Sequence, residues 1–382
     1  MRIKKVSATN FKNLNLNGTP FRSVTLVLGE NGVGKSNLIL LLHTFFKKKE
    51  SLKELPPQQF AIEGFVEQKD LIRRGERQGK AEVTVTCFSD AFEDLRKAFF
   101  AKSRQGKSDD VTIEFVYRSY SGGLDVRIPA MRLGRQAIYP IPGKPGDRGL
   151  AEKQKVLEEW VNADLVDATT YIPNSRLLKR GLVDFRIDGP FDAASDLENT
   201  LLKLLTNHDT DPDIFDRIKE TLDRFFRIKD IRPNLERMIE SSRGSESEAA
   251  KTTGQSGVGV GVRIKEDTNR WFDLAQVGTG VQQILVMMTM IQGGLEGKPA
   301  RIALIEEFES SLSIKTRKQF LQQLIEVVGP GKPLRQVIMT SHAIFRPKAQ
   351  EVHSIGPDNP KARTSVNFRQ WEPEDWARHS SG

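Results

Sequence analysis

The sequence predicts an α/β fold with a mixed central sheet that carries a phosphate-binding loop, an antiparallel β subdomain and a helical insertion. Residues 29–36 form a complete G-x-x-x-x-G-K-S pattern between an apolar run and a helical run. Residues 81–88 and 111–118 alternate apolar and polar side chains, which is typical of half-buried antiparallel strands. Apolar residues recur at helical spacing between 195 and 241, which predicts helices there.

The first part of the chain leads into the phosphate loop. Residues 2–10 and 23–28 are expected to be strands, and residues 37–43 a helix. Glycines allow backbone N–H groups to turn inward around phosphates, and the helix N-terminus adds its positive dipole end. We expect Lys35 to bridge the β- and γ-phosphates and the Ser36 hydroxyl to ligate Mg²⁺. The sequence therefore predicts a site for a nucleoside triphosphate.

The rest of the chain divides by composition. Gly122-Gly123 predicts a hairpin turn, and the period becomes helical from 150 to 164. Residues 241–257 are small, polar and glycine-rich, which predicts a mobile connection. Regular α/β patterning then resumes near Val258.

Three regions are expected on this basis. The first is an N-terminal lobe, 1–175, which holds the phosphate loop and the antiparallel β subdomain. The second is the helical insertion with its flexible linker, 176–257. The third is a C-terminal lobe, 258–382.

Composition restricts the class of protein. The net charge of +8 and the pI near 9.4 permit contact with nucleic acid or an acidic partner without establishing it. The single cysteine, Cys87, excludes an intrachain disulfide and fits a reducing compartment. No signal-peptide h-region is evident, and the most apolar segment, 284–291, is too short to span a bilayer. We expect a cytoplasmic protein with no membrane contact.

Two later segments have sequence patterns that are typical of other parts of a nucleotide-binding site. Residues 301–307 form an apolar strand that ends in two carboxylates, the pattern of a Walker B element. Glu306 would hold Mg²⁺ through water, and Glu307 would orient and deprotonate the attacking water. Residues 277–283 form a glycine-rich turn that opens a helix, which is a second place where phosphate can bind.

The order of these motifs resembles the ABC-type ATPase heads of the SMC, RecF and overcoming-lysogenization-defect (OLD) families. Residues 310–312 stand at the position of the D-loop, and residues 335–342 form a strand that ends in T-S-H. The resemblance implies an ABC-type P-loop ATPase head of the AAA family. It also implies that Gly278 and Gly280 belong to the signature motif, which completes the active site of the opposite subunit. In the same way, His342 would be the switch residue near the γ-phosphate.

Finer features resemble the OLD-like branch. Residues 8–14 resemble its N-terminal "NFK" strand ending, and residues 71–75 ahead of 81–83 resemble its "IR-G…A-V" passage. Residues 306–312 resemble its E-E-P-E-x-x-L-H-P segment. The resemblance covers both ends of the chain well but residues 90–270 only loosely.

The chain also departs from that pattern. Phe308 replaces the usual proline and Ser313-Ile314 replaces His-Pro, so we expect an atypical D-loop geometry. Arg176, after the strand ending at 171–173, is a candidate to face the nucleotide. Weak candidates for the Q-loop residue are Gln58, Gln59 and Gln68.

These motifs define the expected site, with ATP and Mg²⁺ as its ligands. The residues expected to bind the nucleotide are Gly29, Asn31, Gly32, Gly34, Lys35, Ser36, Asn37, Gly278 and Gly280. The residues expected to take part in catalysis are Lys35, Glu307 and His342. Those expected to hold the metal are Ser36 and Glu306.

The resemblance also implies a biological setting. Forty residues follow His342 and contain no strand with a D-x-D pattern, so the Toprim nuclease domain of full OLD proteins is not expected. Stand-alone ATPases of this kind act with a separately encoded effector, often a nuclease, in anti-phage defence systems such as Septu or PARIS. We therefore expect an ATP-hydrolysing head that dimerises head to tail at least and regulates such an effector.

Other functions stay open at this point. A RecF-like DNA-repair ATPase shares the same motifs and differs only in its DNA-facing surfaces, so the sequence does not separate it from the first hypothesis. An ABC transporter subunit is disfavoured by the missing Q-loop residue and the "NFK" start. A non-enzymatic ATP-gated scaffold is disfavoured by the presence of Glu307.

Overall fold

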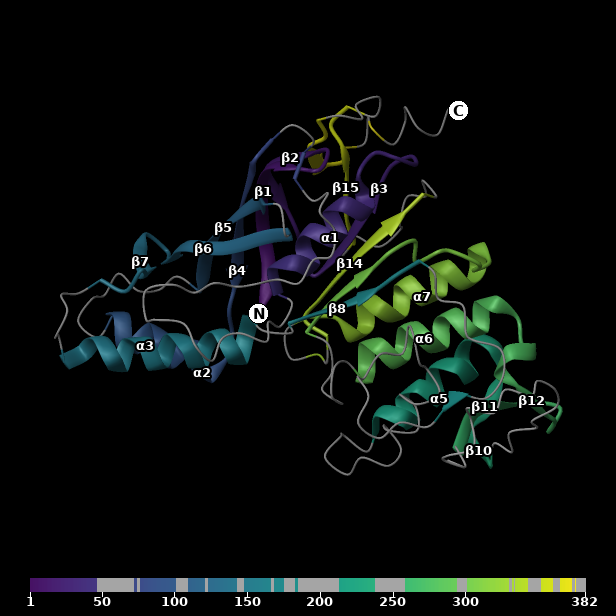
Figure 1. Cartoon of the computed structure of the whole chain (residues 1–382). Coiled ribbons are helices and arrows are strands. Elements are labelled where there is room, and N and C mark those ends of the chain that lie inside the picture. The colour runs from purple at the N-terminus through teal and green to yellow at the C-terminus, as the bar shows by residue number, and fades with distance from the viewer. Residues whose placement is uncertain are drawn as a thin grey trace, which may run out of the picture. The chain divides into compact units, whose positions relative to one another are not determined.

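A computed structural model describes most of the chain (Figure 1). The described residues are 1–46, 72–73, 76–100, 109–120, 123–142, 148–165, 168–174, 183–184, 213–237, 258–293, 301–329, 332, 334–342, 352–359, 365–372 and 375. The chain forms two compact units. The first comprises Met1–Tyr171, Arg301–Glu309 and Phe320–Gly382, and the second comprises Ile172–Ala300 and Ser310–Gln319.

The first unit contains an antiparallel sheet with strand order β2-β1-β4-β5-β6-β7. Its strands are β1 (Arg2–Phe11), β2 (Leu14–Pro20), β4 (Gln78–Thr86), β5 (Asp110–Tyr120), β6 (Gly123–Leu133) and β7 (Gln136–Tyr139). Tyr120 pairs with Gly123, which confirms the predicted hairpin. One side of β4 and β5 is buried at every second residue, as the alternation predicted. Cys87, just after β4, is buried.

A second sheet of the first unit carries the phosphate loop. Its order is β16-β15-β3-β14-β13-β8, and β13, β14, β3 and β15 are parallel neighbours. Its strands are β3 (Val24–Leu28), β8 (Thr169–Ile172), β13 (Ile302–Ile305), β14 (Gln336–Ser341), β15 (Val352–Pro357) and β16 (Phe368–Gln370). All residues of β3 are buried, and this fits its uninterrupted apolar sequence, because a parallel sheet is covered on both of its faces.

Helices complete the first unit. Helix α1 (Lys35–Phe46) follows β3 directly and contacts β13 and β14, and it buries Leu38, Ile39, Leu41 and Leu42. Helices α2 (Asp90–Phe100) and α3 (Arg148–Trp160) pack against each other. Helix α7 (Ile314–Val327) lies between β13 and β14 in the sequence, and only its residues from Phe320 onward belong to the first unit. Mixed sheet, antiparallel sheet and covering helices together confirm the predicted fold class.

One buried side chain joins the two sheets. The Gln336 amide, at the start of β14, is fully buried, and its Oε1 accepts from the Ile3 N–H at 2.8 Å. Its Nε2 donates to the Ile3 carbonyl at 2.8 Å and to the Arg22 carbonyl at 2.9 Å. Gln336 therefore fixes the antiparallel sheet against the sheet that carries the phosphate loop.

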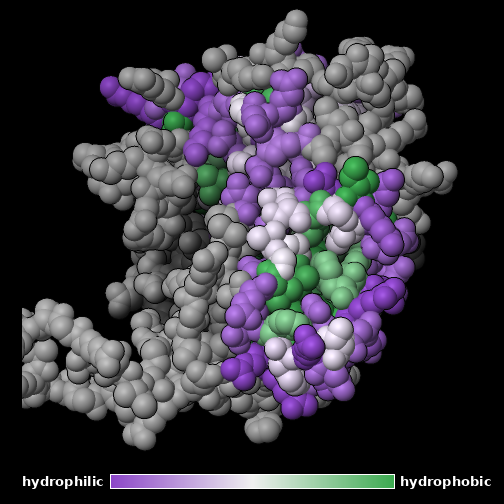
Figure 2. All heavy atoms as spheres, turned by 90° about the vertical axis from the view of Figure 1, so that its right-hand side faces the viewer, coloured by the Kyte–Doolittle hydropathy of each residue, from purple (hydrophilic) through white to green (hydrophobic). Residues whose placement is uncertain are grey.

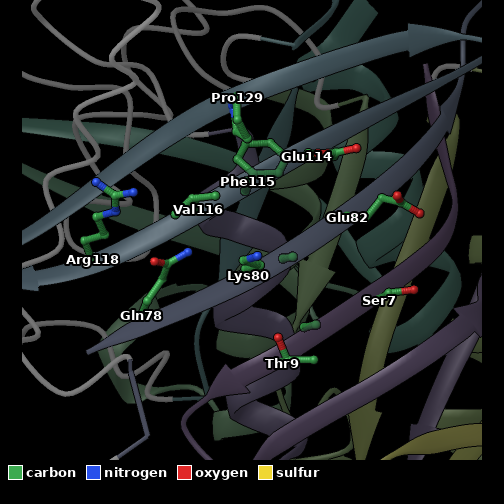
Figure 3. A pocket seen from close by; sticks show the side chains of 12 residues that line it. Ser7, Thr9, Gln78, Lys80, Glu82, Glu114, Phe115, Val116, Arg118 and Pro129 are labelled. Atoms are coloured by element: carbon green, nitrogen blue, oxygen red, sulfur yellow. The ribbon is translucent and has the colours of Figure 1, made fainter. Parts of the chain in front are cut away.

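The other face of the antiparallel sheet holds a groove of about 570 Å³ (Figure 3). Polar and apolar side chains of β1, β4, β5 and β6 line it, and its described lining contains no residue of the phosphate loop. The side chains labelled in Figure 3 that carry charge are Lys80, Glu82, Glu114 and Arg118. The groove is therefore separate from the predicted nucleotide site.

The second unit combines helices with a small sheet of order β10-β11-β12, with β9 also paired to β11. Its elements are β9 (Val183–Asp184), α5 (Asp213–Phe226), β10 (Ile228–Arg237), β11 (Val258–Glu266), β12 (Trp271–Asp273), the 3₁₀ turn η2 (Leu274–Gln276) and α6 (Thr279–Gly293). In the part of the chain that the structure describes, no helix is both long and apolar enough to cross a membrane.

The prediction of helices over 195–241 is wrong at its C-terminal end. A helix is present over Asp213–Phe226, but residues 228–237 form strand β10. Pro233 removes a helical hydrogen bond and clashes with the preceding turn, whereas an edge strand tolerates it. β10 lies at the end of its sheet, as that argument requires. Residues 185–212 and the predicted mobile connection lie outside the described residues.

Candidate functional site

The phosphate loop connects β3 to α1 as predicted. Gly29, Gly32 and Gly34 have φ values of 143°, 80° and 93°, a region that favours glycine. A Cβ atom on Gly34 would also lie 2.7 Å from the Asn13 Oδ1 atom. That oxygen accepts a hydrogen bond from Asn37 Nδ2 at 2.8 Å. Asn13, in the turn between β1 and β2, therefore braces the loop and requires a glycine beside it.

Lys35 points back into its own loop. Its side chain is almost fully buried, and Nζ donates to the carbonyls of Gly29 at 2.6 Å and Glu30 at 2.8 Å. The third contact of Nζ is His342 Nδ1, at 2.9 Å. An ammonium group has three donors, so all three have acceptors within the protein.

His342 connects Lys35 to Glu307. Its Nε2 lies 2.6 Å from Glu307 Oε1. A lysine ammonium group can only donate, so His342 Nδ1 accepts and the ring proton lies on Nε2, which donates to Glu307. The structure thus brings together the three residues that the sequence predicts for catalysis, Lys35, His342 and Glu307.

Burial also changes the pKa of the lysine in this loop. It lowers the pKa of Lys35 from 10.5 to about 8, because the charged ammonium group loses contact with water. The carboxylates of Glu307, Glu309 and Glu30 oppose this shift and raise the pKa. Lys35 therefore remains mostly charged at neutral pH but loses its proton in mildly alkaline solution.

The segment after β13 is held by the end of β14. The Glu307 N–H donates to Thr340 Oγ1 at 2.9 Å, and the Phe308 N–H donates to the Thr340 carbonyl at 3.3 Å. The His342 N–H donates to Glu309 Oε1 at 2.6 Å. Glu307 itself has a φ of 43°, which is uncommon for a residue other than glycine.

Phe308 shows how the D-loop departs from the OLD-like pattern. The proline that usually stands at this position has no N–H group and could not donate to Thr340. The Phe308 ring is fully buried, so it also adds apolar packing beneath the loop. The two carboxylates before it differ in exposure, since Glu306 is buried and Glu307 is half-buried.

The predicted signature turn lies in the second unit with part of the D-loop. A Cβ atom on Gly280 would lie 3.1 Å from the Ser311 carbonyl, so this approach favours glycine. Gln283 Nε2 contacts Ser311 Oγ at 3.4 Å. Gln282 Nε2 donates to two backbone carbonyls of the preceding turn, at 2.9 and 3.1 Å, which fixes the turn before Gly278. The signature turn and Ser311 thus form one braced group.

Two large apolar side chains of the second unit are exposed. Ile314, the first residue of α7, is 69% exposed, and Trp271, the first residue of β12, is 37% exposed. Arg232 Cζ and Lys265 Nζ lie 5.0 and 5.9 Å from the Trp271 ring centroid, within the range of cation–π interactions. Figure 2 turns the side with α6, α7 and β12 toward the viewer and shows hydrophobic residues gathered among hydrophilic ones. Ile314, three residues after Ser311, leaves an apolar side chain beside the D-loop.

Sequence reasoning missed three supporting residues. Thr340 and His342 are two residues apart at the end of a strand, and this spacing places them on one face, so Thr340 could have been found. Asn13 and Glu309 carry no comparable signal, because their contacts come from other elements. The weak candidates Gln58, Gln59, Gln68 and Arg176 lie outside the described residues.

Comparisons with known proteins agree with this fold. An SMC head bound to the C-winged helix domain of ScpA is 14% identical, with a TM-score of 0.51 over 99% of this chain and 100% of that chain. An SMC head domain from Thermotoga maritima is 13% identical, with a TM-score of 0.45 over 97% and 100%. The recombination mediator RecF with ATP is 14% identical, with a TM-score of 0.44 over 96% and 97%. At 14% identity the similarity to the first of these structures shows the fold alone.

Sequence comparison gives the family. No curated protein sequence matches the chain. The family described as "AAA domain, putative AbiEii toxin, Type IV TA system" matches residues 150–344, a little over half of the chain. Since that match includes the Walker B segment and His342, and the phosphate loop precedes it, the chain belongs to this AAA-domain family and is an ABC-type P-loop ATPase.

Proposed function

We propose that the chain binds ATP with Mg²⁺ at residues 29–36 and hydrolyses it with Glu307 as the general base. The contact from Lys35 through His342 to Glu307 carries this proposal. Lys35 Nζ is the group that would meet the γ-phosphate, and it lies one imidazole ring away from the Glu307 carboxylate. A water molecule that attacks the γ-phosphate would therefore lie within reach of Glu307.

The residues present suit Mg²⁺. This ion prefers oxygen ligands, keeps several waters and is held by one or two protein groups plus substrate phosphates. The Ser36 hydroxyl at the start of α1 and the buried Glu306 carboxylate are oxygen donors of this kind. Among the described residues no group of three or more His, Cys, Asp or Glu side chains could hold a metal. The metal would neutralise charge on the phosphates and leave the proton transfer to the protein.

The chain's own groups then have separate tasks. The loop N–H groups and Lys35 bind and orient the phosphates. Asn31 and Asn37, which belong to the same segment, would also contact the nucleotide. Glu307 takes a proton from the attacking water, while His342 Nε2–H keeps that carboxylate oriented. Lys35 offsets the charge that develops on the phosphoryl oxygens.

We further propose that two copies act together, head to tail. Gly278, Gly280 and the N-terminus of α6 would meet the γ-phosphate held by the partner copy, because a glycine turn at a helix N-terminus suits an anion. The exposed Ile314 beside the D-loop supports a contact surface in the same region.

The output of hydrolysis is proposed to be a change of shape passed to a separately encoded effector, a nuclease, in anti-phage defence of the Septu or PARIS kind. The matching family's description names a toxin of a type IV TA system, and this favours defence over transport. The SMC head of the similar structure is bound to a domain of ScpA, which supports a protein partner. A RecF-like DNA-repair ATPase is the alternative, and it would contact DNA directly.

Replacing Glu307 tests the catalytic part. Glu307→Gln keeps an oxygen that accepts from His342 but removes the base, so ATP binding should persist while turnover falls about 10²-fold. Glu82→Gln, in the groove of the antiparallel sheet, is the control and should leave turnover unchanged. Turnover near the wild-type rate in Glu307→Gln would exclude Glu307 as the base.

Co-expression tests the effector. The purified chain alone should not cut DNA with or without ATP, whereas co-expression with the neighbouring gene should give a stable complex with nuclease activity. Cleavage by the lone chain, or recovery of no partner, would contradict the effector proposal. Stimulation of ATP hydrolysis by DNA without a second protein would favour the RecF-like alternative.

A further inference from the structure

The end of strand β14 provides acceptors for two N–H groups beyond the regular sheet. Strands β13 and β14 pair in parallel from Ile302 with Gln336 to Ile305 with Met339. Past that point the buried Thr340 accepts from the Glu307 N–H with its hydroxyl and from the Phe308 N–H with its carbonyl. Thr340 therefore binds the N–H groups of both Glu307, the proposed base, and Phe308, the residue that follows it.

The backbone of Glu307 depends on such support. A φ of 43° lies in the left-handed region, which costs free energy in a residue with a side chain and persists where the surroundings enforce it. The hydrogen bond from the Glu307 N–H to Thr340 Oγ1, at 2.9 Å, acts on this same residue. It fixes the direction in which the Glu307 carboxylate leaves the backbone, toward His342.

A second hydrogen bond holds the other member of the pair. The His342 N–H donates to Glu309 Oε1 at 2.6 Å, and Glu309 is 6% exposed. A carboxylate acceptor makes this a charge-assisted bond, which is stronger than a bond between neutral groups. Thr340 at the end of β14 thus holds Glu307, and Glu309 in the segment after β13 holds His342.

We propose that Thr340 and Glu309 are positioning residues for ATP hydrolysis: together they fix the relative placement of Glu307 and His342. Both act through these two residues. The inference rests on the proposed role of Glu307 as the base. It predicts that breaking either bond lowers turnover while the phosphate loop continues to bind ATP.

Thr340 gives the sharper test. Thr340→Val keeps the shape and removes the hydroxyl acceptor, whereas Thr340→Ser keeps it. Because a displacement of about 1 Å in an active site can cost 10²-fold in rate, we expect kcat to fall at least about tenfold in Thr340→Val. KM for ATP should stay within about twofold. Thr340→Ser should restore kcat to within about threefold of the wild type.

A matched control separates position from stability. Thr25 is a fully buried residue of β3 in the same sheet, and its Oγ1 accepts from the Arg22 N–H at 2.9 Å. Thr25→Val removes the same type of bond at the end of β3 that is remote from the phosphate loop. It should lower the melting temperature, as Thr340→Val should, but leave kcat unchanged.

Glu309 is tested in the same assay. Glu309→Gln keeps an amide oxygen that can accept from the His342 N–H, so it should retain more activity than Glu309→Ala. A wild-type kcat in Thr340→Val, or a kcat in Thr340→Ser as low as in Thr340→Val, would overturn the inference. Glu307→Gln is measured in parallel: if it is inactive while Thr340→Val is fully active, only the inference fails, and if it is active, the proposed base is wrong.

Discussion

The affinity of the site for ATP should fall as pH rises through about 8, because Lys35 loses its charge there. Burial lowers the pKa of Lys35 in the free protein to about 8. Phosphate oxygens next to the ammonium group favour its charged form and raise its pKa in the complex. Above pH 8 binding must therefore take up a proton, and below it the lysine is already charged.

The size of the effect follows from that value. One pH unit above its pKa, only about one free lysine in eleven carries a proton, so the dissociation constant at pH 9 should be roughly tenfold higher than at pH 7. This factor corresponds to about 1.4 kcal/mol. Phosphate groups are fully ionised over most of this range and add little to the change.

Isothermal titration of the Mg²⁺ complex of a non-hydrolysable ATP analogue into the wild-type chain, which keeps the Glu307 carboxylate beside Lys35, measures this effect between pH 7 and 9. Repeating the titration in buffers with different ionisation enthalpies gives the number of protons that the protein takes up on binding. Lys35→Arg keeps its charge throughout and should show a flat profile. Lys35→Ala should bind at least tenfold more weakly at pH 7, also with a flat profile. A constant dissociation constant for the parent lysine between pH 7 and 9 would refute the reasoning.

Two further substitutions and one titration test other parts of the structure. Gly280→Val should lower ATP hydrolysis at least tenfold without changing ATP binding, because its side chain would displace the Ser311 carbonyl, whereas Gly280→Ala should be milder; equal activity of both would contradict this. Gln336→Leu should lower the free energy of unfolding in urea by at least about 2 kcal/mol, since the two buried backbone groups of Ile3 lose partners worth about 1–3 kcal/mol each, while the Arg22 carbonyl still accepts from the Thr25 hydroxyl; a loss below about 1 kcal/mol would contradict this. The specific ATPase rate should rise with protein concentration until the dimer forms, unless ultracentrifugation already shows an oligomer; a fully active monomer would exclude the head-to-tail site.

The sequence predicted the elements whose local pattern matches their surroundings. The phosphate loop follows a fully buried strand and opens α1 because each part has its own signal, which comprises apolar residues, glycines and then a helical run. The strands at 81–88 and 111–118 were equally clear, since one face of their sheet is buried. The meeting of Lys35, His342 and Glu307 followed from motif order, because parallel strands bring their carboxyl ends to one edge.

Other features could not be predicted because they depend on contacts between distant segments. Strand β10 has apolar residues that fit a helix in a short window, and its pairing with β11, more than twenty residues later, decides the outcome. Gln336 gives no local sign that its amide will join two sheets. The left-handed backbone of Glu307 and its hydrogen bond to Thr340 appear only after β13 and β14 lie side by side.

The complete set of acceptors around Lys35 has a consequence for the end of the catalytic cycle. After hydrolysis the γ-phosphate departs, and the diphosphate that remains holds the lysine less strongly. The lysine can then return to the two loop carbonyls and to His342 without leaving any of its three donors unmet. This return competes directly with the spent nucleotide. We expect it to accelerate release of ADP, so that resetting the enzyme is driven by its own loop and not only by dilution of the product.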